Sequence, residues 1–344
     1  MGGKLPGGPF LVWVKRTLTI PFQRAILIIA SPAAVRLSEA AGEMIRNLRK
    51  GGSMEHLIVA SVTPFTRENQ IHEAALKALW ERNLSEGADG FFVGGSSGEC
   101  FLLSETERLR TFELAAEYGG RAEIFAHAGA LSTDQAVFLA KRARELGIER
   151  IAATPPFYFA YSPREIARYY DDLAQAAGGP VLYYNIPSST HRSLDLDHPD
   201  VQAMFRSGAI GAVKHTNLNL YEMERIRNLN PDIRCYGGFE SSMVAFLGFG
   251  CDGFIGSSFN FMLPQFRQIL KLCHRGEAEE ARRLQSRSNN ILDVILREGL
   301  CASLKYILNR QGIDAGQVRR PMLPLGPKAQ EAVDRALEEN LLIK

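Results

Sequence analysis

The chain has 344 residues, 46% of them hydrophobic and 23% charged, and its 40 basic and 38 acidic side chains give a formal net charge of +2. Fractions of this kind are typical of globular proteins and exclude disordered, collagen-like and coiled-coil chains. No apolar run reaches the roughly 20 residues that a membrane helix needs, so we expect a soluble protein with no membrane partner.

The charge is divided unevenly along the chain. Residues 1–53 contain eight basic and two acidic side chains, a net of +6, whereas 32 basic and 36 acidic side chains give residues 54–344 a net of −4. A mildly acidic body offers no basic surface for nucleic acid, and we therefore expect no nucleic-acid partner.

Residues 1–53 combine Gly-rich ends with one short apolar stretch, 25–30, which Gln23 and Arg24 separate from the residues before it. That stretch is shorter than the apolar region of a secretory signal. We interpret residues 1–53 as an N-terminal extension that takes no part in catalysis, in preference to a targeting peptide, and expect the folded body to begin at Met54.

The cysteines are odd in number, widely spaced and form no Cys-x-x-Cys pair. That pattern is typical of thiols in a reducing compartment rather than of a disulfide or zinc framework. We therefore expect a cytoplasmic protein whose cysteines are buried thiols, namely Cys100, Cys235, Cys251, Cys273 and Cys301.

From Met54 onward, short β-rich runs alternate with helical patterns. Because these runs are apolar without a polar alternation, they predict strands buried on both faces, as in a parallel sheet. The predicted strands are 57–61, 90–93, 123–126, 150–153, 180–184, 210–213, 233–236 and 253–256.

The helical patterns carry start signals. Ser104, Ser132 and Ser162 each stand three residues before a Glu or Gln, the arrangement of a capping box. Eight strand-helix units in residues 54–274 predict a closed (β/α)₈ barrel, with a doubly wound open sheet as the alternative. Beyond Arg275 the strand signals stop, and we expect a C-terminal helical region, 275–344, with helices over 277–299, 300–310 and 327–342.

Lys214 follows an uncharged run, 207–213, at the end of the sixth predicted strand. In such a barrel, chemistry lies at the C-terminal ends of strands. Desolvation there lowers the pKa of an amine, and a neutral lysine can attack a carbonyl to form a Schiff base. On position alone, a lysine that simply reaches water is the commoner interpretation.

Two neighbouring strand ends strengthen the catalytic interpretation. Tyr184 ends the fifth strand, where a phenol can exchange a proton with a substrate hydroxyl, although alone it fits packing equally well. Ser96 and Ser97, among glycines after the second strand, offer hydroxyl and N–H groups suited to a small carboxylate, although alone they fit a tight turn.

Three motifs at these strand ends, 95–99 (GSSGE), 184–187 (YNIP) and 213–214 (VK), carry a resemblance to a known family. In order and spacing they are similar to the signatures of the pyruvate-dependent class I aldolases. That superfamily includes N-acetylneuraminate lyase and dihydrodipicolinate synthase. The resemblance covers residues 55–340.

The resemblance implies a role for each of these residues. Lys214 would condense with the keto carbon of pyruvate, and Tyr184 would be the general acid and base. Ser97 and Tyr158 would form the family's hydroxyl relay, with Tyr158 lent by a neighbouring subunit of a homotetramer. Ser96 and Ser97 would bind the pyruvate carboxylate, and no metal or organic cofactor would be needed.

The branch of the superfamily depends on a few further positions. The synthase carries an arginine where this chain has Ser189, and a neutral serine cannot make a bidentate carboxylate contact. Dihydrodipicolinate synthase is therefore the alternative function, kept open by the nearby Arg192.

Segments after the seventh and eighth strands resemble those of the lyase. By that match Glu240 and Ser257 would contact substrate hydroxyls, and Gly238 would do so through its backbone. Ser241 stands where the lyase has a second acid, which favours a shorter 2-keto-3-deoxy sugar acid. The alternative role for Glu240 is an acid placed to suit a helix dipole.

Other interpretations of the same barrel stay open at this point. Gly-rich loops at 237–238 and 256–258 could bind a phosphosugar. His127 and His215 fall near strand ends, but the seven histidines include no HExxH pair, and we expect no metal. A non-catalytic barrel that serves as a ligand sensor or assembly subunit is the interpretation of another class.

Overall fold

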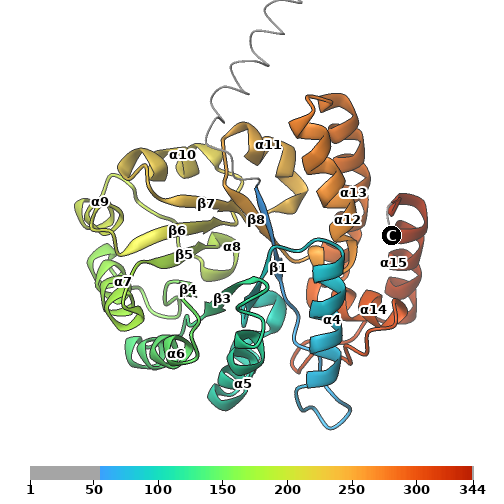
Figure 1. Cartoon of the computed structure of the whole chain (residues 1–344), viewed down its shortest axis with the longest axis horizontal. Coiled ribbons are helices and arrows are strands. Elements are labelled where there is room, and N and C mark those ends of the chain that lie inside the picture. The colour runs from blue at the N-terminus through green and yellow to red at the C-terminus, as the bar shows by residue number, and fades with distance from the viewer. Residues whose placement is uncertain (1–54, 343–344) are drawn as a thin grey trace, which may run out of the picture. The chain divides into compact units, whose positions relative to one another are not determined.

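The computed structural model describes residues 55–342, so the interpretation of residues 1–53 lies outside the described residues. Eight parallel strands pair in chain order into a closed barrel (Figure 1). The strands are β1 (His56–Ala60), β2 (Gly90–Val93), β3 (Glu123–His127), β4 (Arg150–Ala153), β5 (Val181–Asn185), β6 (Ile210–His215), β7 (Arg234–Gly237) and β8 (Gly253–Gly256).

The predicted (β/α)₈ barrel is confirmed, because β1 pairs with β8 and closes the sheet, with Leu57 opposite Phe254. A doubly wound sheet would leave both edges open. Each strand lies within two residues of its predicted bounds. The largest difference is in β6, which continues through His215 and so includes Lys214 as a strand residue.

Helices follow the strands around the barrel. The capping boxes at Ser104 and Ser162 are both formed, whereas Ser132 is an ordinary N-cap whose hydroxyl accepts the N–H of Gln135. The helices are α4 (Glu73–Ser85), α5 (Glu105–Ala116), α6 (Thr133–Glu145), α7 (Pro163–Ala177), α8 (Pro187–Thr190), α9 (Pro199–Arg206), α10 (Leu220–Leu229), α11 (Met243–Gly248) and α12 (Phe259–His274). Three 3₁₀ turns accompany them, η1 (Ser96–Gly98), η2 (Cys100–Leu102) and η3 (Glu240–Ser242).

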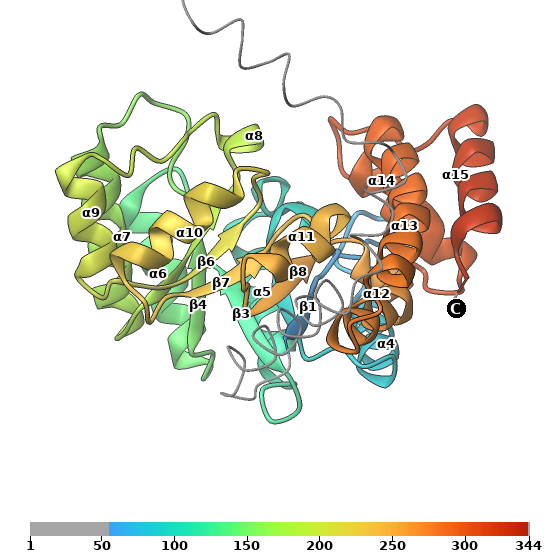
Figure 2. The same cartoon turned by 90° about the horizontal axis from the view of Figure 1, so that it is seen from above.

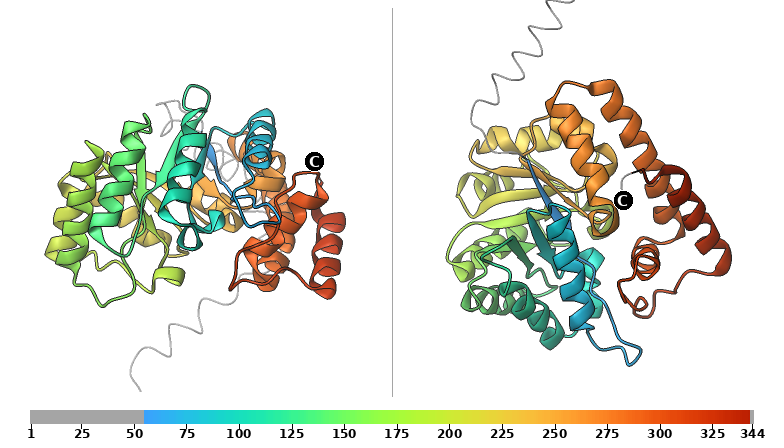
Figure 3. Two further views of the ribbon diagram at one scale, coloured as in Figure 1. Left: turned by 90° about the horizontal axis from the view of Figure 1, so that it is seen from below. Right: turned by 45° about the vertical axis from the view of Figure 1, so that its right-hand side comes forward.

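Three further helices follow the barrel, α13 (Ala278–Glu298), α14 (Leu300–Arg310) and α15 (Pro327–Asn340). They lie on the side of the barrel where α12 and α4 run (Figures 1 and 2). The two views of Figure 3 show the same arrangement. These helices match the three expected after residue 275, and a domain boundary at 274/275 stays a prediction.

Strand alternation divides the core into two parts. On β5, Tyr184 faces the barrel interior with Phe92 and Tyr236, whereas Tyr183 faces outward and stacks against Tyr170 of α7. Residues two apart on a strand therefore share a face, which decides which side chains reach the mouth of the barrel.

Burial differs among the cysteines. Cys100, Cys235 and Cys251 are buried, as expected, but Cys273 and Cys301 are partly exposed. Those two lie on the outer helices α12 and α14, where only one face of each helix packs inward. In residues 55–342, no helix is both long and apolar enough to cross a membrane.

Candidate active site

Lys214 and Tyr184 lie side by side inside the barrel. They are register partners on β6 and β5, and both side chains are buried. The Lys214 Nζ lies 4.0 Å from the centroid of the Tyr184 ring and 4.7 Å from that of Phe92. A lysine only 4% exposed is not one that simply reaches water, so the plainer interpretation of Lys214 is wrong.

The loop after β2 borders the same space. A Cβ atom added at Gly95 would lie 2.6 Å from the ring of Phe92, the residue whose face Lys214 touches, so the loop needs glycine there. Ser96 and Ser97 open the turn η1, in which the first N–H groups have no partner within the turn. Ser97 is buried and Ser96 is exposed.

Glu240 and Ser257 meet on the wall formed by the loops after β7 and β8. The Oε1 of Glu240 accepts hydrogen bonds from Ser257 Oγ at 3.0 Å and from the N–H and Oγ of Ser258, each at 2.8 Å. Glu240 thus joins the loop after β7 to the loop after β8. These hydrogen bonds, and not a helix dipole alone, hold its buried carboxylate in place.

Gly238 packs against Thr216, which lies two residues after Lys214. A Cβ atom at Gly238 would lie 1.9 Å from the Oγ1 of Thr216 and 3.0 Å from its Cα. Only glycine fits there, and the backbone of Gly238 lies close to the inward face of β6.

Tyr158 lies apart from these residues. Its side chain is 73% exposed, and its ring packs against Phe159, with the centroids 5.0 Å apart. Lys214 and Tyr184 thus pack together inside the barrel, whereas Tyr158 lies on an exposed loop between β4 and α7.

Two threonines at the mouth of the barrel had no role predicted for them from the sequence. Thr154 and Thr216 are buried, and among residues 55–342 neither Oγ1 atom has a hydrogen-bond partner. Each follows an inward residue, Ala152 or Lys214, by two positions. Strand alternation was therefore the signal that could have found them.

His127 holds three strand ends together. Its Nδ1 donates to the carbonyl of Gly94, 2.9 Å away, and its Nε2 accepts the N–H of Thr154 at 3.1 Å. Burial, together with the nearby Arg108 cation, holds the pKa of His127 well below its ordinary value. The ring is therefore neutral, and both nitrogens are used.

His215 also has both ring nitrogens hydrogen-bonded, and it links β5 and β6. Its Nε2 donates to the carbonyl of Asn219, and its Nδ1 accepts from Asn185, whose Nδ2 also donates to Glu222 at 2.6 Å. Burial lowers the pKa of His215 to about 4 and raises that of Glu222. This network joins the strands that carry Tyr184 and Lys214 to α10.

A metal site and a phosphate site have less support from the structure than a site built on Lys214. Among residues 55–342, no three His, Cys, Asp or Glu side chains are grouped so that they could hold a metal ion. In the two Gly-rich loops, Ser257 and Ser258 are turned to the Glu240 carboxylate, an arrangement that repels a phosphate rather than binding one.

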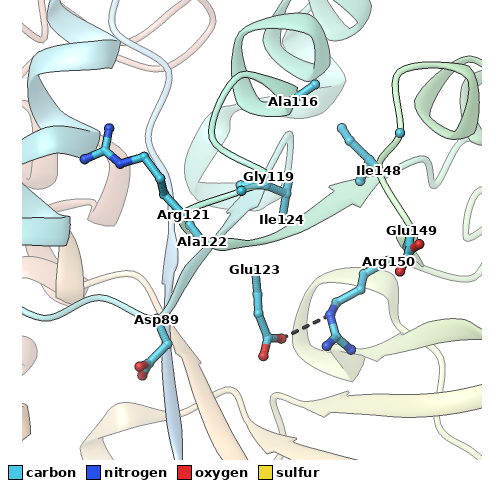
Figure 4. Close-up of a pocket in the computed structure, with 12 residues that line it drawn as sticks. Asp89, Ala116, Gly119, Arg121, Ala122, Glu123, Ile124, Ile148, Glu149 and Arg150 are labelled. Carbon is cyan, nitrogen blue, oxygen red and sulfur yellow. Dashed lines mark ion pairs between the residues drawn. The ribbon is translucent and has the colours of Figure 1, made fainter.

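A separate cavity of about 620 Å³ lies at the other end of the barrel, where β3 and β4 begin. Figure 4 shows Glu123 and Arg150 pointing toward one another, whereas Arg121 points away. The Nε of Arg150 and the Oε2 of Glu123 form an ion pair at 3.1 Å. The amino ends of strands carry stability rather than chemistry in this fold, so we place the active site at the Lys214 end.

Comparison with known proteins assigns the chain to a family. Residues 53–340 match the model of the dihydrodipicolinate synthetase family, and the chain belongs to that family. The resemblance to the pyruvate-dependent class I aldolases is thereby confirmed. The protein is an enzyme of the carbon–carbon lyase class, which sets aside a non-catalytic ligand sensor.

Three similar proteins point to one branch of this family. N-acetylneuraminate lyase of Escherichia coli (strain SMS-3-5 / SECEC) is 32% identical over 279 residues, which cover 80% of this chain and 93% of that protein. CdNal from Clostridium difficile, in complex with mannosamine, is 31% identical with a TM-score of 0.79, over 84% of this chain and 100% of that one. N-acetylneuraminate lyase from Fusobacterium nucleatum, complexed with pyruvate, is 31% identical with a TM-score of 0.77, over 84% and 97%.

Proposed function

We propose that this enzyme is a Schiff-base aldolase that cleaves or forms a carbon–carbon bond between pyruvate and an aldehyde. The observation that carries the proposal is the buried amine of Lys214, 4.0 Å from the centroid of the Tyr184 ring inside the barrel. A buried amine beside a phenol supplies the nucleophile and the proton-transfer group that this reaction needs.

The reaction proceeds through covalent bonds to Lys214. Its nitrogen attacks the keto carbon of the substrate, and loss of water gives a protonated imine. Tyr184 then takes the proton of the substrate hydroxyl, the electron pair of the broken carbon–carbon bond moves into the imine, and an aldehyde leaves. The enamine that remains takes a proton back at carbon, and water releases pyruvate.

Ser96 and Ser97 bind the pyruvate carboxylate through their N–H and hydroxyl groups. The N–H groups at the start of η1 are the donors that the turn leaves without an internal partner, and they suit an anion. Since no step transfers electrons to an external acceptor, we propose that the enzyme uses no metal or organic cofactor.

The rest of the substrate lies against Gly238, Glu240 and Ser257. Glu240 accepts protein hydrogen bonds through Oε1, and its Oε2 is the oxygen left for a substrate hydroxyl. We propose a substrate like that of N-acetylneuraminate lyase or a shorter 2-keto-3-deoxy sugar acid, because Ser241 removes one acceptor from this wall.

The contacts of Arg192 argue against the alternative activity of dihydrodipicolinate synthase. Its guanidinium donates to the carbonyl of Tyr161 at 2.7 Å and to that of Phe159, and it stacks on the Tyr161 ring. Donors engaged in this way are not available for a second carboxylate, and this favours the lyase over dihydrodipicolinate synthase.

We further propose a cytoplasmic homotetramer in which Tyr158 serves the site of a neighbouring subunit. Its exposure, with that of Phe159 at 63%, supports this arrangement, because two large exposed aromatic side chains side by side are common at interfaces. Tyr158 and Ser97 would then pass the proton of Tyr184 to and from water.

A substrate panel tests the branch. We expect turnover of N-acetylneuraminate or 2-keto-3-deoxygluconate, assayed as pyruvate release, and none with aspartate semialdehyde plus pyruvate. The Ser241→Asp variant should shift the preference toward N-acetylneuraminate, with Ser241→Asn as the uncharged control. If the enzyme turned over only the pair of aspartate semialdehyde and pyruvate, and neither sugar acid, the lyase assignment would be refuted.

A further inference from the structure

Glu99 ends the loop that carries Ser96 and Ser97, and its side chain turns away from the barrel interior. Its backbone is left-handed, with a φ of 58°, which is uncommon outside glycine and is kept only where the surroundings enforce it. The side chain is fully buried. The loop is therefore held by whatever the Glu99 carboxylate contacts.

The contacts of Glu99 come from α14 and from the segment between α14 and α15, about 200 residues away in sequence. Lys305 of α14 places its Nζ 2.7 Å from Oε1 of Glu99, as an ion pair rather than an aligned hydrogen bond, and the Lys305 side chain is 2% exposed. The backbone N–H of Arg319 donates to the other oxygen, Oε2, at 2.8 Å.

Lys305 is fixed from two other directions. Its Nζ donates to the carbonyl of Gln317 at 2.9 Å and lies 3.8 Å above the ring of Phe65. Burial lowers the pKa of Lys305 to about 8, while the Glu99 carboxylate opposes that change. The amine is buried and its contacts are with Glu99, Gln317 and Phe65, so we assign its role to the position it gives Glu99.

A second ion pair ties down the chain just beyond the loop. The Arg319 guanidinium contacts both oxygens of Glu107, the partner of Ser104 in the capping box of α5, and one of these distances is 2.7 Å. Arg319 also donates to the carbonyl of Leu102 at 3.0 Å and stacks on Phe65. The segment from Glu99 to Glu107 is thus joined at both ends to residues 305–319.

Buried ion pairs of this kind add little net stability, because desolvation offsets the attraction between the charges. What they do provide is a fixed geometry, since removing one partner leaves a buried charge unpaired. The loop that this geometry fixes is the one proposed to bind the substrate carboxylate.

We propose that Lys305, acting through Glu99, is a positioning residue for the carboxylate-binding loop, so that the C-terminal helices form part of the pyruvate site. This proposal rests on the proposed function of Ser96 and Ser97. It predicts that the ion pair governs pyruvate affinity rather than the chemical steps at Lys214.

The test compares three proteins with wild type by trapping the imine with borohydride at increasing pyruvate concentration. The variants are Lys305→Met, the neutral double variant Glu99→Gln/Lys305→Met, and Arg310→Met. Arg310 is the control, because it lies on the same helix in an exposed pair with Asp334 at 3.7 Å. Circular dichroism and the melting temperature report folding.

We expect the half-saturating pyruvate concentration to rise about tenfold in both Lys305 variants, equivalent to about 1.4 kcal/mol, with Lys214 still fully trapped at saturation. Arg310→Met should match wild type. A folded double variant with wild-type half-saturation would overturn the positioning role. Wild-type protein that traps no pyruvate would instead overturn the proposed function, so the two failures are distinguishable.

Discussion

Lys214 and Tyr184 are register partners on the neighbouring strands β6 and β5, and the amine lies 4.0 Å from the centroid of the phenol ring. The register of the barrel therefore sets the distance between the proposed nucleophile and the proposed acid and base. A shift of one residue in either strand would turn one of the two side chains out of the barrel.

Replacing Tyr184 with Phe should separate the two halves of the reaction. The ring that packs against Lys214 is kept and the hydroxyl is lost, so imine formation should change little. Cleavage of the carbon–carbon bond should slow about 100-fold or more, the range expected for general acid–base catalysis. Borohydride trapping and pyruvate release measure the two steps. Equal loss of both would contradict the role of Tyr184.

Glu240→Gln should weaken binding of the sugar acid and leave pyruvate binding unchanged. A hydrogen bond to a charged group contributes about 1.5–3 kcal/mol, so KM for the sugar acid should rise at least about tenfold. Steady-state kinetics with the best substrate of the panel measure this, beside the half-saturation of trapping by pyruvate. A comparable change in pyruvate half-saturation would show that Glu240 acts on the whole site.

Gly238→Ala should destabilise the fold, because its Cβ would lie 1.9 Å from the Thr216 side chain. Overpacking of this kind costs about 1–3 kcal/mol. Gly120→Ala is the matched control, since a Cβ there meets no atom within 4 Å. Chemical denaturation gives both values, and an equal effect of the two substitutions would argue against the close approach of Gly238 to β6.

His215 should make the protein less stable in acid. Its pKa is lowered from 6.5 to about 4, so between these values the unfolded chain binds a proton that the folded chain does not. The contribution is complete above pH 6.5 and falls by about 3 kcal/mol as the pH drops to 4.

Comparison of wild type with His215→Asn isolates this effect, because Glu222 titrates in both proteins. The difference in unfolding free energy should shrink as the pH falls from 7 to 4. A difference that stays constant over that range would mean that folding does not lower the pKa of His215.

The barrel and the centre of the site could be predicted from the sequence because both depend on local patterns. Apolar runs identified the strands, and strand ends identified Lys214, Tyr184 and the loop with Ser96 and Ser97. Strand alternation also places Thr154 and Thr216 at the mouth, although the sequence alone does not tell which hydroxyls lack partners.

Contacts between distant segments could not be predicted in the same way. Nothing in the sequence near Glu99 or Lys305 indicates that they pair, because the pairing depends on how α14 packs against the barrel. The position of Tyr158 likewise depends on its exposed loop, and its proposed partner site belongs to another copy of the chain.

The central claim is that Lys214 forms the covalent bond to pyruvate. The most direct test is borohydride reduction in the presence of pyruvate, followed by intact mass measurement and peptide mapping of the wild-type protein. We predict one reduced pyruvate per chain, on Lys214, and none in a Lys214→Ala variant. Modification of another lysine, or an unmodified Lys214, would contradict the account.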